Sequence, residues 1–337
     1  DLPGMKCPWA EDLADAKRVA VKLGIDFGVW DFEKEYREKV VDYMLAEFRK
    51  GSTPNPDIMC NQEIKFKLFY EKAVEAGADF IATGHYARVN NGQLLRAVDE
   101  NKDQTYFLYR ISEEALRRTL FPIGEMTKPE VKKLAEKYGL HNAYKKESMG
   151  VCFVGEVGMK DFLKEYIDVQ PGEIREIESE RVLGYHEGAV FYTIGQRHGL
   201  YLNGNKGEVN DGMPYYVVTK DTERNIVYVS KNLNDKHIWT RELRLKDVVL
   251  RQFEHVLSGT GRSRPHISVA TSEMPREECS QLPLCTLSVR LRHRAPLIPA
   301  RFDGETLYFE KEIKRPANGQ SAVLYDGEAC LGGGIIA

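Results

Sequence analysis

The hydrophobic pattern of the chain changes near residue 170, and this change constrains the fold more than any other feature. Before it, amphipathic helical stretches such as residues 12–23, 33–50 and 66–77 alternate with short apolar runs. After it, short runs rich in Val, Ile, Tyr and Phe alternate with Gly, Asn and Asp turns. The first pattern is typical of a parallel α/β sheet, and the second of an antiparallel barrel or sandwich. A chain of 337 residues is long enough for two or three such domains.

The first half contains two candidate strands. Residues 25–32, "IDFGVWDF", follow a helical stretch that ends at Gly24, and residues 78–86, "ADFIATGHY", form an apolar run up to Gly84. Ligands of parallel α/β sheets bind beyond the carboxyl ends of the strands. We therefore expect residues 84–86 to lie at a ligand site.

Residues 114–165 predict further helices, and the β-rich pattern begins beyond them. The runs expected to form strands are "AVFYTIG", "PYYVVTKD", "NIVYVS", "CTLSVRLR", "TLYFE" and "SAVLYDG". The glycines of "CLGGGII" near the end are expected to serve tight barrel geometry. We expect three domains, at residues 1–113, 114–213 and 214–337, with an irregular Ser-, Gly- and Pro-rich insertion at 254–283.

The start of the sequence lies in the middle of this pattern. An α/β nucleotide domain normally opens with a strand and a glycine-rich phosphate loop, whereas this chain opens with "DLPGMKCPWAEDL". A sheet without its first strand would be a poor core. We therefore expect that a preceding segment with the first strand and the phosphate loop is not in this sequence. A complete chain with an unusual start is the alternative.

Charge and cysteine usage narrow the class of protein. The net charge of −3 gives no overall basic field, although a local basic face suffices for nucleic acid. No apolar run approaches the roughly 18 residues that span a bilayer, so we expect no membrane association. The six scattered cysteines contain no C-x-x-C pair, which argues against a secreted disulfide framework and a structural zinc site. A reducing cytoplasm fits best.

Cys60 is a candidate reactive thiol. A lone cysteine is more often a buried small hydrophobe. However, it follows the stiff polar turn "TPNPD", and Asn61 is a plausible N-cap, which would put the thiol beside the positive end of a helix. Lys65 adds a positive charge one turn further on. These features favour a thiolate.

Cys152 is harder to interpret. The segment "MGVCFVG" alternates apolar residues and, taken alone, reads as an interior strand with cysteine as filler. Gly150 and Gly155 bracket it, however, and the polar run "YKKES" precedes it, so a short segment that returns to a cleft is the alternative. Spacing along the chain does not show that Cys60 and Cys152 meet.

Two further polar segments are candidates for binding. The triplet Lys102-Asp103-Gln104 precedes an aromatic run, "TYFLYRI", that reads as a strand, and an ordinary solvated turn is the alternative. In "VRLRHRAP", a strand would place the arginines 290, 292 and 294 on one face as a row of guanidinium groups suited to phosphates. A solvated edge strand is an equally good interpretation.

These segments together resemble the tRNA-specific 2-thiouridylase family over nearly the whole chain. The resemblance rests on "EDLADAKRVA", "GSTPNPDIMCNQEIKFK", "ADFIATGHYAR", "NKDQTYFLY", "LFPIGEMTKPEVKKLAE", "KKESMGVCFVG", "YTIGQRHGL" and "GQSAVLYDGEACLGGGII". The two cysteine segments are highly specific as a pair. The resemblance implies an adenine-nucleotide α-hydrolase-like domain, a small central domain and a C-terminal β-barrel.

The resemblance also implies the chemistry. The family adenylates the C2 oxygen of the wobble uridine with ATP and Mg²⁺, and a cysteine persulfide then delivers sulfur. Cys152 would carry the persulfide, and Cys60 would release the sulfur, or generate hydrosulfide, by forming a disulfide with Cys152. Asp57 would act in proton transfer. A sulfur-carrier protein or a cysteine desulfurase would supply the sulfur.

The remaining roles come from the same resemblance, residue by residue. Asn55, Pro56 and Asp57 would face the target base, and Gly84 would contact ATP. The residues that would contact tRNA are His85, Lys102, Asp103, Gln104, Arg292, His293 and Gln320.

Two other functions remain open from the sequence. Asp57, Cys60 and Cys152 are also suited to hold an iron–sulfur cluster, which sequence does not separate from a disulfide mechanism. A non-catalytic tRNA-binding protein is the other alternative, since the family's phosphate loop S-G-G-V-D-S is not in this sequence.

Overall fold

The computed structural model describes residues 9–145, 158–202, 213–232, 234–235, 237–251 and 285–337. The chain divides into two compact units. The first comprises Asp1–Leu45 and Pro56–Asp168, and the second comprises Ala46–Asn55 and Val169–Ala337. The predicted domain boundaries at residues 113 and 213 stay predictions. Cys152 and the predicted insertion at 254–283 lie outside the described residues.

Helix α1 (Trp9–Leu23) confirms the helix predicted at 12–23, and Gly24 follows it with a φ of 66°. The strand predicted at 25–32 is wrong. Within the part of the chain that the structure describes, these residues pair with no strand, and Ile25, Phe27, Val29 and Trp30 are exposed. A strand needs a neighbour that supplies backbone hydrogen bonds, and hydrophobic character alone does not provide one.

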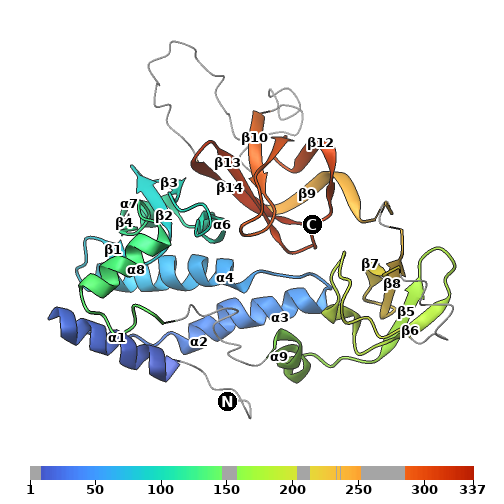
Figure 1. Ribbon diagram of the computed structural model, residues 1–337, viewed down its shortest axis with the longest axis horizontal. Coiled ribbons are helices and arrows are strands. Elements are labelled where there is room, and N and C mark those ends of the chain that lie inside the picture. Colours follow the sequence, from blue (N-terminus) through green and yellow to red (C-terminus); the bar gives the residue numbers. More distant parts are fainter. Residues whose placement is uncertain (1–8, 146–157, 203–212, 233, 236, 252–284) are drawn as a thin grey trace. The chain divides into compact units, whose positions relative to one another are not determined.

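The helix predicted at 33–50 is confirmed. It runs through α2 (Glu33–Tyr36), the π-helical segment η1 (Arg37–Val41) and α3 (Asp42–Arg49) without a break (Figure 1). Its apolar side chains recur at helical spacing, which is why one face is buried. The buried residues of this face are Val40, Val41, Met44, Leu45 and Phe48.

A second long helix carries the "NPDIMCNQ" motif. It comprises α4 (Pro56–Met59), the π-helical segment η2 (Cys60–Leu68) and α5 (Phe69–Glu75). Pro56 suits the first position, because its fixed φ fits a helix and its missing N–H would have no partner there. The helix therefore begins at Pro56, and the prediction that Asn61 is its N-cap is wrong.

The parallel strand pairing predicted for the first half is present but short. Strand β1 (Ile81–Ala82) pairs with β4 (Thr119–Leu120) in parallel, with Ile81 opposite Thr119. Strands β2 (Ala87–Asn90) and β3 (Gln93–Arg96) form an antiparallel hairpin. Its turn residues, Asn91 and Gly92, have φ angles of 49° and 80°, as a tight two-residue turn requires.

Four short helices complete the first unit. They are α6 (Thr105–Leu108), α7 (Glu113–Arg117), α8 (Lys128–Lys137) and α9 (Met159–Tyr166). Caps fix where they start: the Ser112 hydroxyl accepts from the Ala115 N–H, and the Glu130 carboxylate accepts from the Thr127 N–H at 2.7 Å.

The aromatic strand predicted at 105–111 is wrong, because α6 occupies Thr105–Leu108 and residues 109–111 form no strand. The buried carboxylate of Asp103 accepts from the Thr105 N–H and hydroxyl, and this pairing starts a helical turn.

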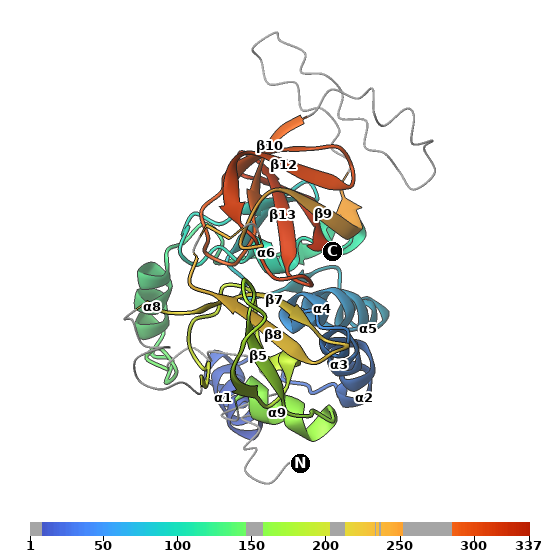
Figure 2. The same ribbon diagram turned by 90° about the vertical axis from the view of Figure 1, so that its right-hand side faces the viewer.

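The second unit contains a four-stranded sheet in the order β6-β5-β8-β7. Its strands are β5 (Gly172–Glu176), β6 (Val182–His186), β7 (Tyr216–Asp221) and β8 (Ile226–Ser230), of which β5, β7 and β8 are seen in Figure 2. Buried valines at 217, 227 and 229 pack with Ile174 and Leu183. The strand predicted at 189–195 is wrong: Ala189–Phe191 form a short 3-10 helix, η3.

The C-terminal barrel has six antiparallel strands in the order β13-β10-β11-β12-β9-β14, and β13 pairs with β14 to close it (Figure 1). The strands are β9 (Trp239–Leu250), β10 (Cys285–Arg290), β11 (Ile298–Phe302), β12 (Thr306–Lys314), β13 (Ser321–Asp326) and β14 (Ala329–Ile336). This confirms the predicted fold class: an α/β domain, a central domain and a C-terminal antiparallel barrel.

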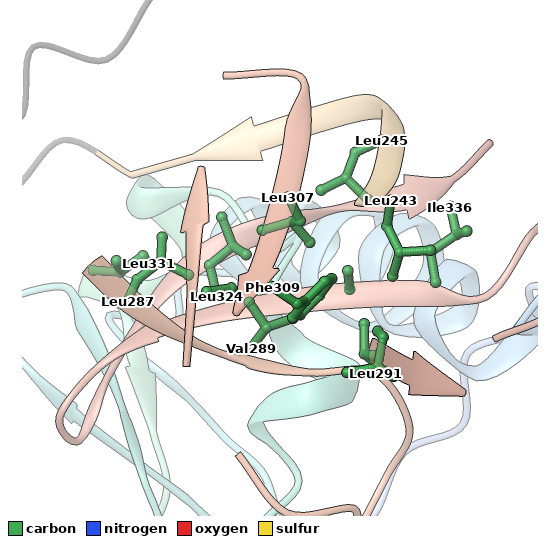
Figure 3. Close-up of a cluster of buried hydrophobic side chains, with 13 residues drawn as sticks. Leu243, Leu245, Leu287, Val289, Leu291, Leu307, Phe309, Leu324, Leu331 and Ile336 are labelled. Atoms are coloured by element: carbon green, nitrogen blue, oxygen red, sulfur yellow. The ribbon is translucent and has the colours of Figure 1, made fainter. Parts of the chain in front are cut away.

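Inward-facing leucines, together with Val289 and Phe309, fill the barrel (Figure 3). The predicted role of the glycines in "CLGGGII" is also confirmed. A Cβ on Gly332 would lie 2.0 Å from the Val249 carbonyl oxygen, and its φ is 130°. Only glycine therefore allows β14 to approach β9 this closely. Among the described residues, no helix has the length and apolar character needed to cross a membrane.

Candidate functional site

Cys60 lies one turn inside its helix. It is 8% exposed and packs with Val40 and Ile64 at the start of η2. The thiol is therefore further along the helix than the predicted position beside an N-cap, and it is covered by apolar side chains. A long π-helical segment is rare and is often found at functional sites.

Asp57 occupies the second position of the same helix. Burial raises the pKa of its carboxyl group above the ordinary value, and the positive charge of Lys65 works against this rise. A carboxyl with a raised pKa holds its proton more readily than an ordinary carboxyl does, which suits a group that takes up and releases a proton. The predicted role of Asp57 in proton transfer stays a prediction, and its environment is compatible with it.

His85 follows the exposed Gly84, just beyond β1. Its Nδ1 lies 2.9 Å from the Thr83 hydroxyl, and its ring packs against Phe66 and Phe121 with centroids 5.6 and 6.4 Å away. Burial, and then the charge of Lys65, lowers the pKa of His85 to about 3. His85 is therefore neutral at pH 7, so it can stack and form hydrogen bonds but carries no charge to offer a phosphate.

Lys65 connects these groups. Its ammonium charge lowers the pKa of both Asp57 and His85, so Lys65 is electrostatically linked to each of them. The sequence pattern placed Lys65 one turn beyond Cys60 but gave no sign of its link to His85, because that link depends on the packing of η2 against the end of β1.

The triplet at 102–104 is largely used to build the protein itself. Asp103 is 1% exposed, and its carboxylate accepts from the Ala97 N–H and from Thr105. Gln104 accepts from the Tyr86 N–H at 2.8 Å through Oε1, and its own N–H donates to the Tyr86 carbonyl. Gln104 thus fixes the residue that follows His85. Direct contact of the triplet with tRNA stays a prediction, as does the role of Lys102.

Sequence reasoning missed Asn61 as a structural anchor. Its side chain is 3% exposed, and its Nδ2 donates to the Phe107 carbonyl at 3.1 Å. This bond ties the residue next to Cys60 to helix α6. The sequence pattern predicts a capping role for Asn61, and only the burial of a polar amide in mid-helix indicates a long-range partner.

The chain that leads to Cys152 is held to helix α1. Lys145, the last described residue before that segment, donates to Asp12 at 2.8 Å and to Asp15 at 2.5 Å. His141 also contacts Asp15 at 2.9 Å. These hydrogen bonds lower the pKa of Asp15 to about 2. Cys152 itself is outside the described residues, so its pairing with Cys60 stays a prediction.

In the second unit, Gln320 forms a hydrogen bond with the segment that precedes the "NPD" motif. Its Nε2 donates to the Thr53 carbonyl at 2.6 Å, and the Thr53 N–H donates to the Asn318 carbonyl at 2.7 Å. Thr53 lies two residues before Asn55. The structure therefore gives Gln320 a positioning role, and its contact with tRNA stays a prediction.

The predicted row of arginines is wrong. Strand β10 ends at Arg290, whose guanidinium is buried over the Tyr325 ring at 5.4 Å. Arg292 and Arg294 are exposed in the following turn, where Arg294 has a φ of 63°. The strand cannot continue through a residue in the left-handed region, so the three side chains do not share one face. His293 is half-buried in the same turn.

Among the residues that the structure describes, no three His, Cys, Asp or Glu side chains gather as a metal ion would require. Cys152, a member of the proposed iron–sulfur set, is not among those residues, so that alternative stays open.

Comparison with known proteins covers nearly the whole chain. Residues 3–156 match a family model described as a tRNA methyl transferase HUP domain, and residues 160–231 match a tRNA methyl transferase PRC-barrel domain. Residues 275–336 match an aminomethyltransferase beta-barrel domain.

Three relatives show the extent of the similarity. A protein of Geobacillus kaustophilus named tRNA-specific 2-thiouridylase MnmA 1 is 44% identical over 334 residues. Proteins named tRNA-specific 2-thiouridylase MnmA from Lactococcus lactis and Bacillus subtilis are 41% and 40% identical. Each alignment covers 98% of this chain and 83 to 84% of the relative.

Proposed function

The chain belongs to the tRNA-specific 2-thiouridylase family, and from this premise we propose that it replaces the C2 oxygen of the wobble uridine of tRNA with sulfur. The observation that best supports this function is the placement of Cys60 and Asp57 one turn apart on one helix, with the charge of Lys65 acting on both Asp57 and His85. A thiol, a proton-transfer group and a neutral stacking ring are what sulfur transfer to a base requires.

The first proposed step activates the base with ATP, which reacts as its Mg²⁺ complex. The C2 oxygen of uridine attacks the α-phosphate, pyrophosphate leaves, and the oxygen becomes part of an AMP ester that departs more easily. Gly84 is the residue that we assign to ATP. It is exposed just beyond β1, and a Cβ there would meet no atom of the described residues within 4 Å, so these residues leave room for a nucleotide.

The second proposed step moves the sulfur. The terminal sulfur of a Cys152 persulfide attacks C2 and AMP leaves. The Cys60 thiolate then attacks the Cys152 sulfur, the S–S bond to the base breaks, and a Cys60–Cys152 disulfide forms. In the variant route, Cys60 attacks first and the released hydrosulfide attacks C2. Either route ends in a disulfide that an external dithiol must reduce. Asp57 takes up and releases the proton that these steps exchange.

The remaining assignments concern recognition and supply. We assign Asn55 and Pro56 to the target base, and His85, Lys102, Asp103, Gln104, Arg292, His293 and Gln320 to tRNA, either by contact or by positioning. A sulfur-carrier protein or a cysteine desulfurase would load Cys152, and the reaction would take place in the cytoplasm. A neutral His85 between aromatic rings is suited to an unstacked base.

The test is a reconstituted assay with tRNA, ATP and a persulfide donor, in which both 2-thiouridine and AMP are measured. Cys60→Ala and Cys152→Ala should abolish 2-thiouridine. Cys330→Ala is the matched control, because Cys330 is also buried but lies in the barrel. Full activity of either catalytic variant would contradict the mechanism.

The same assay separates the other functions. Release of AMP that depends on tRNA would exclude a protein that only binds RNA. Full turnover of an anaerobic preparation without bound iron would exclude the iron–sulfur route, whereas loss of turnover on removal of iron would favour it over the disulfide.

A further inference from the structure

The loop of residues 192–199, "YTIGQRHG", is held rigidly by its own side chains. The Gln196 amide accepts from the Thr193 N–H at 3.1 Å and donates to the His198 carbonyl at 2.8 Å. The Tyr192 hydroxyl donates to the Gly199 carbonyl at 3.0 Å, which closes the loop. One amide and one hydroxyl thus fix both ends of the loop and its middle.

The backbone of this loop is also paired to strand β7. The Gly195 N–H donates to the Val217 carbonyl at 2.7 Å, and the Val217 N–H donates to the Gln196 carbonyl at 3.0 Å. Gly195 and Gly199 have φ angles of 81° and 78°, which glycine adopts at little cost. The tip residues Arg197 and His198 are left exposed on a preorganised support.

Two lysines from other strands approach the same loop. The side chain of Lys314, at the end of β12, lies across Gly195: a Cβ on that glycine would be 2.6 Å from Lys314 Cε and 2.8 Å from Nζ. Lys220 of β7 donates to the Tyr192 carbonyl at 2.9 Å. Arg197 belongs to the loop, Lys314 reaches it at Gly195 and Lys220 reaches it at Tyr192, and we call these three residues the cationic triad.

None of the triad is neutralised by an acidic side chain within the described residues. Among the residues that the structure describes, Arg197 contacts the His198 ring at 3.5 Å and Lys220 contacts the Tyr192 carbonyl. Elsewhere in the same unit, surface cations such as Arg175 and Arg244 do pair with glutamates. Three unneutralised cations around one loop are what an anion site requires.

The environment of Lys220 points the same way. Burial lowers the pKa of its ammonium group to about 8. Its single carbonyl partner leaves two of the three N–H groups for other acceptors. A phosphate oxygen would replace the lost hydration and restore the ordinary pKa.

We propose that the 192–199 loop and the cationic triad form a binding site for phosphate groups of the tRNA backbone, built from other residues than those assigned to the target base. The inference rests on the proposed function, because it takes tRNA as the substrate. Arg197 offers the two-pronged donor geometry that fits a phosphate, and Lys314 adds a second charge beside the glycine backbone. The site positions the RNA and does not read its sequence.

The test is the salt dependence of tRNA binding, measured from 50 to 300 mM salt. Arg197→Ala and Lys314→Ala should each weaken binding and reduce the slope of log K against log salt by about 0.7 to 0.9 per lost phosphate contact. The double variant should lose about twice as much. Lys311→Ala is the matched control, because Lys311 is an exposed lysine of the same strand. It should leave the slope unchanged.

Charge-retaining variants separate a phosphate contact from a structural role. Arg197→Lys and Lys314→Arg should keep most of the slope, whereas a purely structural loss would not be rescued. An unchanged slope in the double variant, or an equal loss in Lys311→Ala, would overturn the inference. If the wild-type protein forms 2-thiouridine but the double variant binds tRNA with an unchanged salt slope, only the phosphate site is refuted. A wild-type protein that binds tRNA with this triad but never thiolates it would refute the proposed function instead.

Discussion

Asp57 and His85 respond in opposite ways to the same surroundings. Burial disfavours the charged form of each, so the pKa of the carboxyl rises and that of the imidazole falls. Lys65 opposes the shift of Asp57 and adds to the shift of His85. One ammonium group therefore brings the pKa of Asp57 back toward its ordinary value and lowers the pKa of His85 further than burial does.

Replacement of this ammonium tests that view. In Lys65→Met, the pKa of both Asp57 and His85 should rise, because Lys65 lowers each of them. The His85 titration can be followed by NMR, and the acidic limb of the pH profile of kcat/KM should move to higher pH. Lys67→Met is the control, because Lys67 pairs with Glu63. If His85 titrated at an unchanged pH in Lys65→Met, the electrostatic link would be absent.

The low pKa of His85 also predicts how stability depends on pH. The unfolded chain protonates this ring near pH 6.5, whereas the folded protein does so only near 3. The contribution of the neutral His85 ring to the free energy of unfolding is therefore fully present above pH 6.5. It is lost as the pH falls from 6.5 toward 3, by up to about 1.4 kcal/mol per pH unit. Urea denaturation of wild type and His85→Gln between pH 7.5 and 4.5 should show a shallower loss for the variant. Parallel curves would contradict the assignment.

At the scale of the element, the sequence predicted the long helices and the barrel but misjudged several short segments. The helices at 12–23, 33–50 and 66–77 have enough turns for their periodicity to decide the structure. The run at 105–111 has strand-like aromatic residues, yet the Asp103 carboxylate starts a helix there. The predicted strand does not extend through the arginine run, because the chain turns after Arg290 and Arg294 adopts a positive φ. Such local hydrogen bonds and turns are not visible in hydrophobic patterns.

The same limit applies to the candidate site. Its residues were found through motifs, but their partners were not. Gln104, which the motif assigns to tRNA, also holds Tyr86, and Asn61, which the pattern predicts as an N-cap, reaches Phe107 from inside the helix. Each of these bonds joins segments far apart in the sequence, and a single sequence holds no record of such contacts.

The closure of the barrel gives a prediction at the element scale. Gly332→Ala should cost about 3 kcal/mol or more, because the new methyl would collide with the Val249 carbonyl and the φ of 130° is unfavourable for alanine. Gly327→Ala is the control, since its Cβ would meet no atom within 4 Å and only its φ of 57° is at issue. Chemical denaturation measures both. An equal cost for the two variants would show that the close approach of β14 to β9 is unimportant.

At the scale of the whole molecule, neighbouring residues of the chain belong to different units. The segment 46–55 is assigned with the barrel, whereas the helix that carries Asp57 and Cys60 starts at Pro56 in the other unit. Within its own unit, the segment is held by Gln320 and Asn318 at Thr53, and by the ion pair of Glu47 with Lys246 at 3.3 Å.

Loss of the Gln320 bond should loosen this segment. In Gln320→Ala, amide hydrogen exchange at residues 51–55 should accelerate while strands β9 and β12 keep their protection. Glu312→Ala, an exposed substitution on β12, is the control. Hydrogen–deuterium exchange followed by mass spectrometry measures both. Unchanged exchange in Gln320→Ala would show that the backbone bond to Asn318 is sufficient to hold residues 51–55 in place.

The hydrogen bonds of Thr53 with Asn318 and Gln320 have a consequence for work with truncated fragments of the protein. A fragment that ends at residue 168 would still contain residues 46–55 but would lack Lys246, Asn318 and Gln320, their partners. The stretch leading into Pro56 would then have no fixed path, although every residue of the cysteine motif would be present. A truncated catalytic half is therefore an unsuitable stand-in for the intact chain, even for questions that concern Cys60 alone.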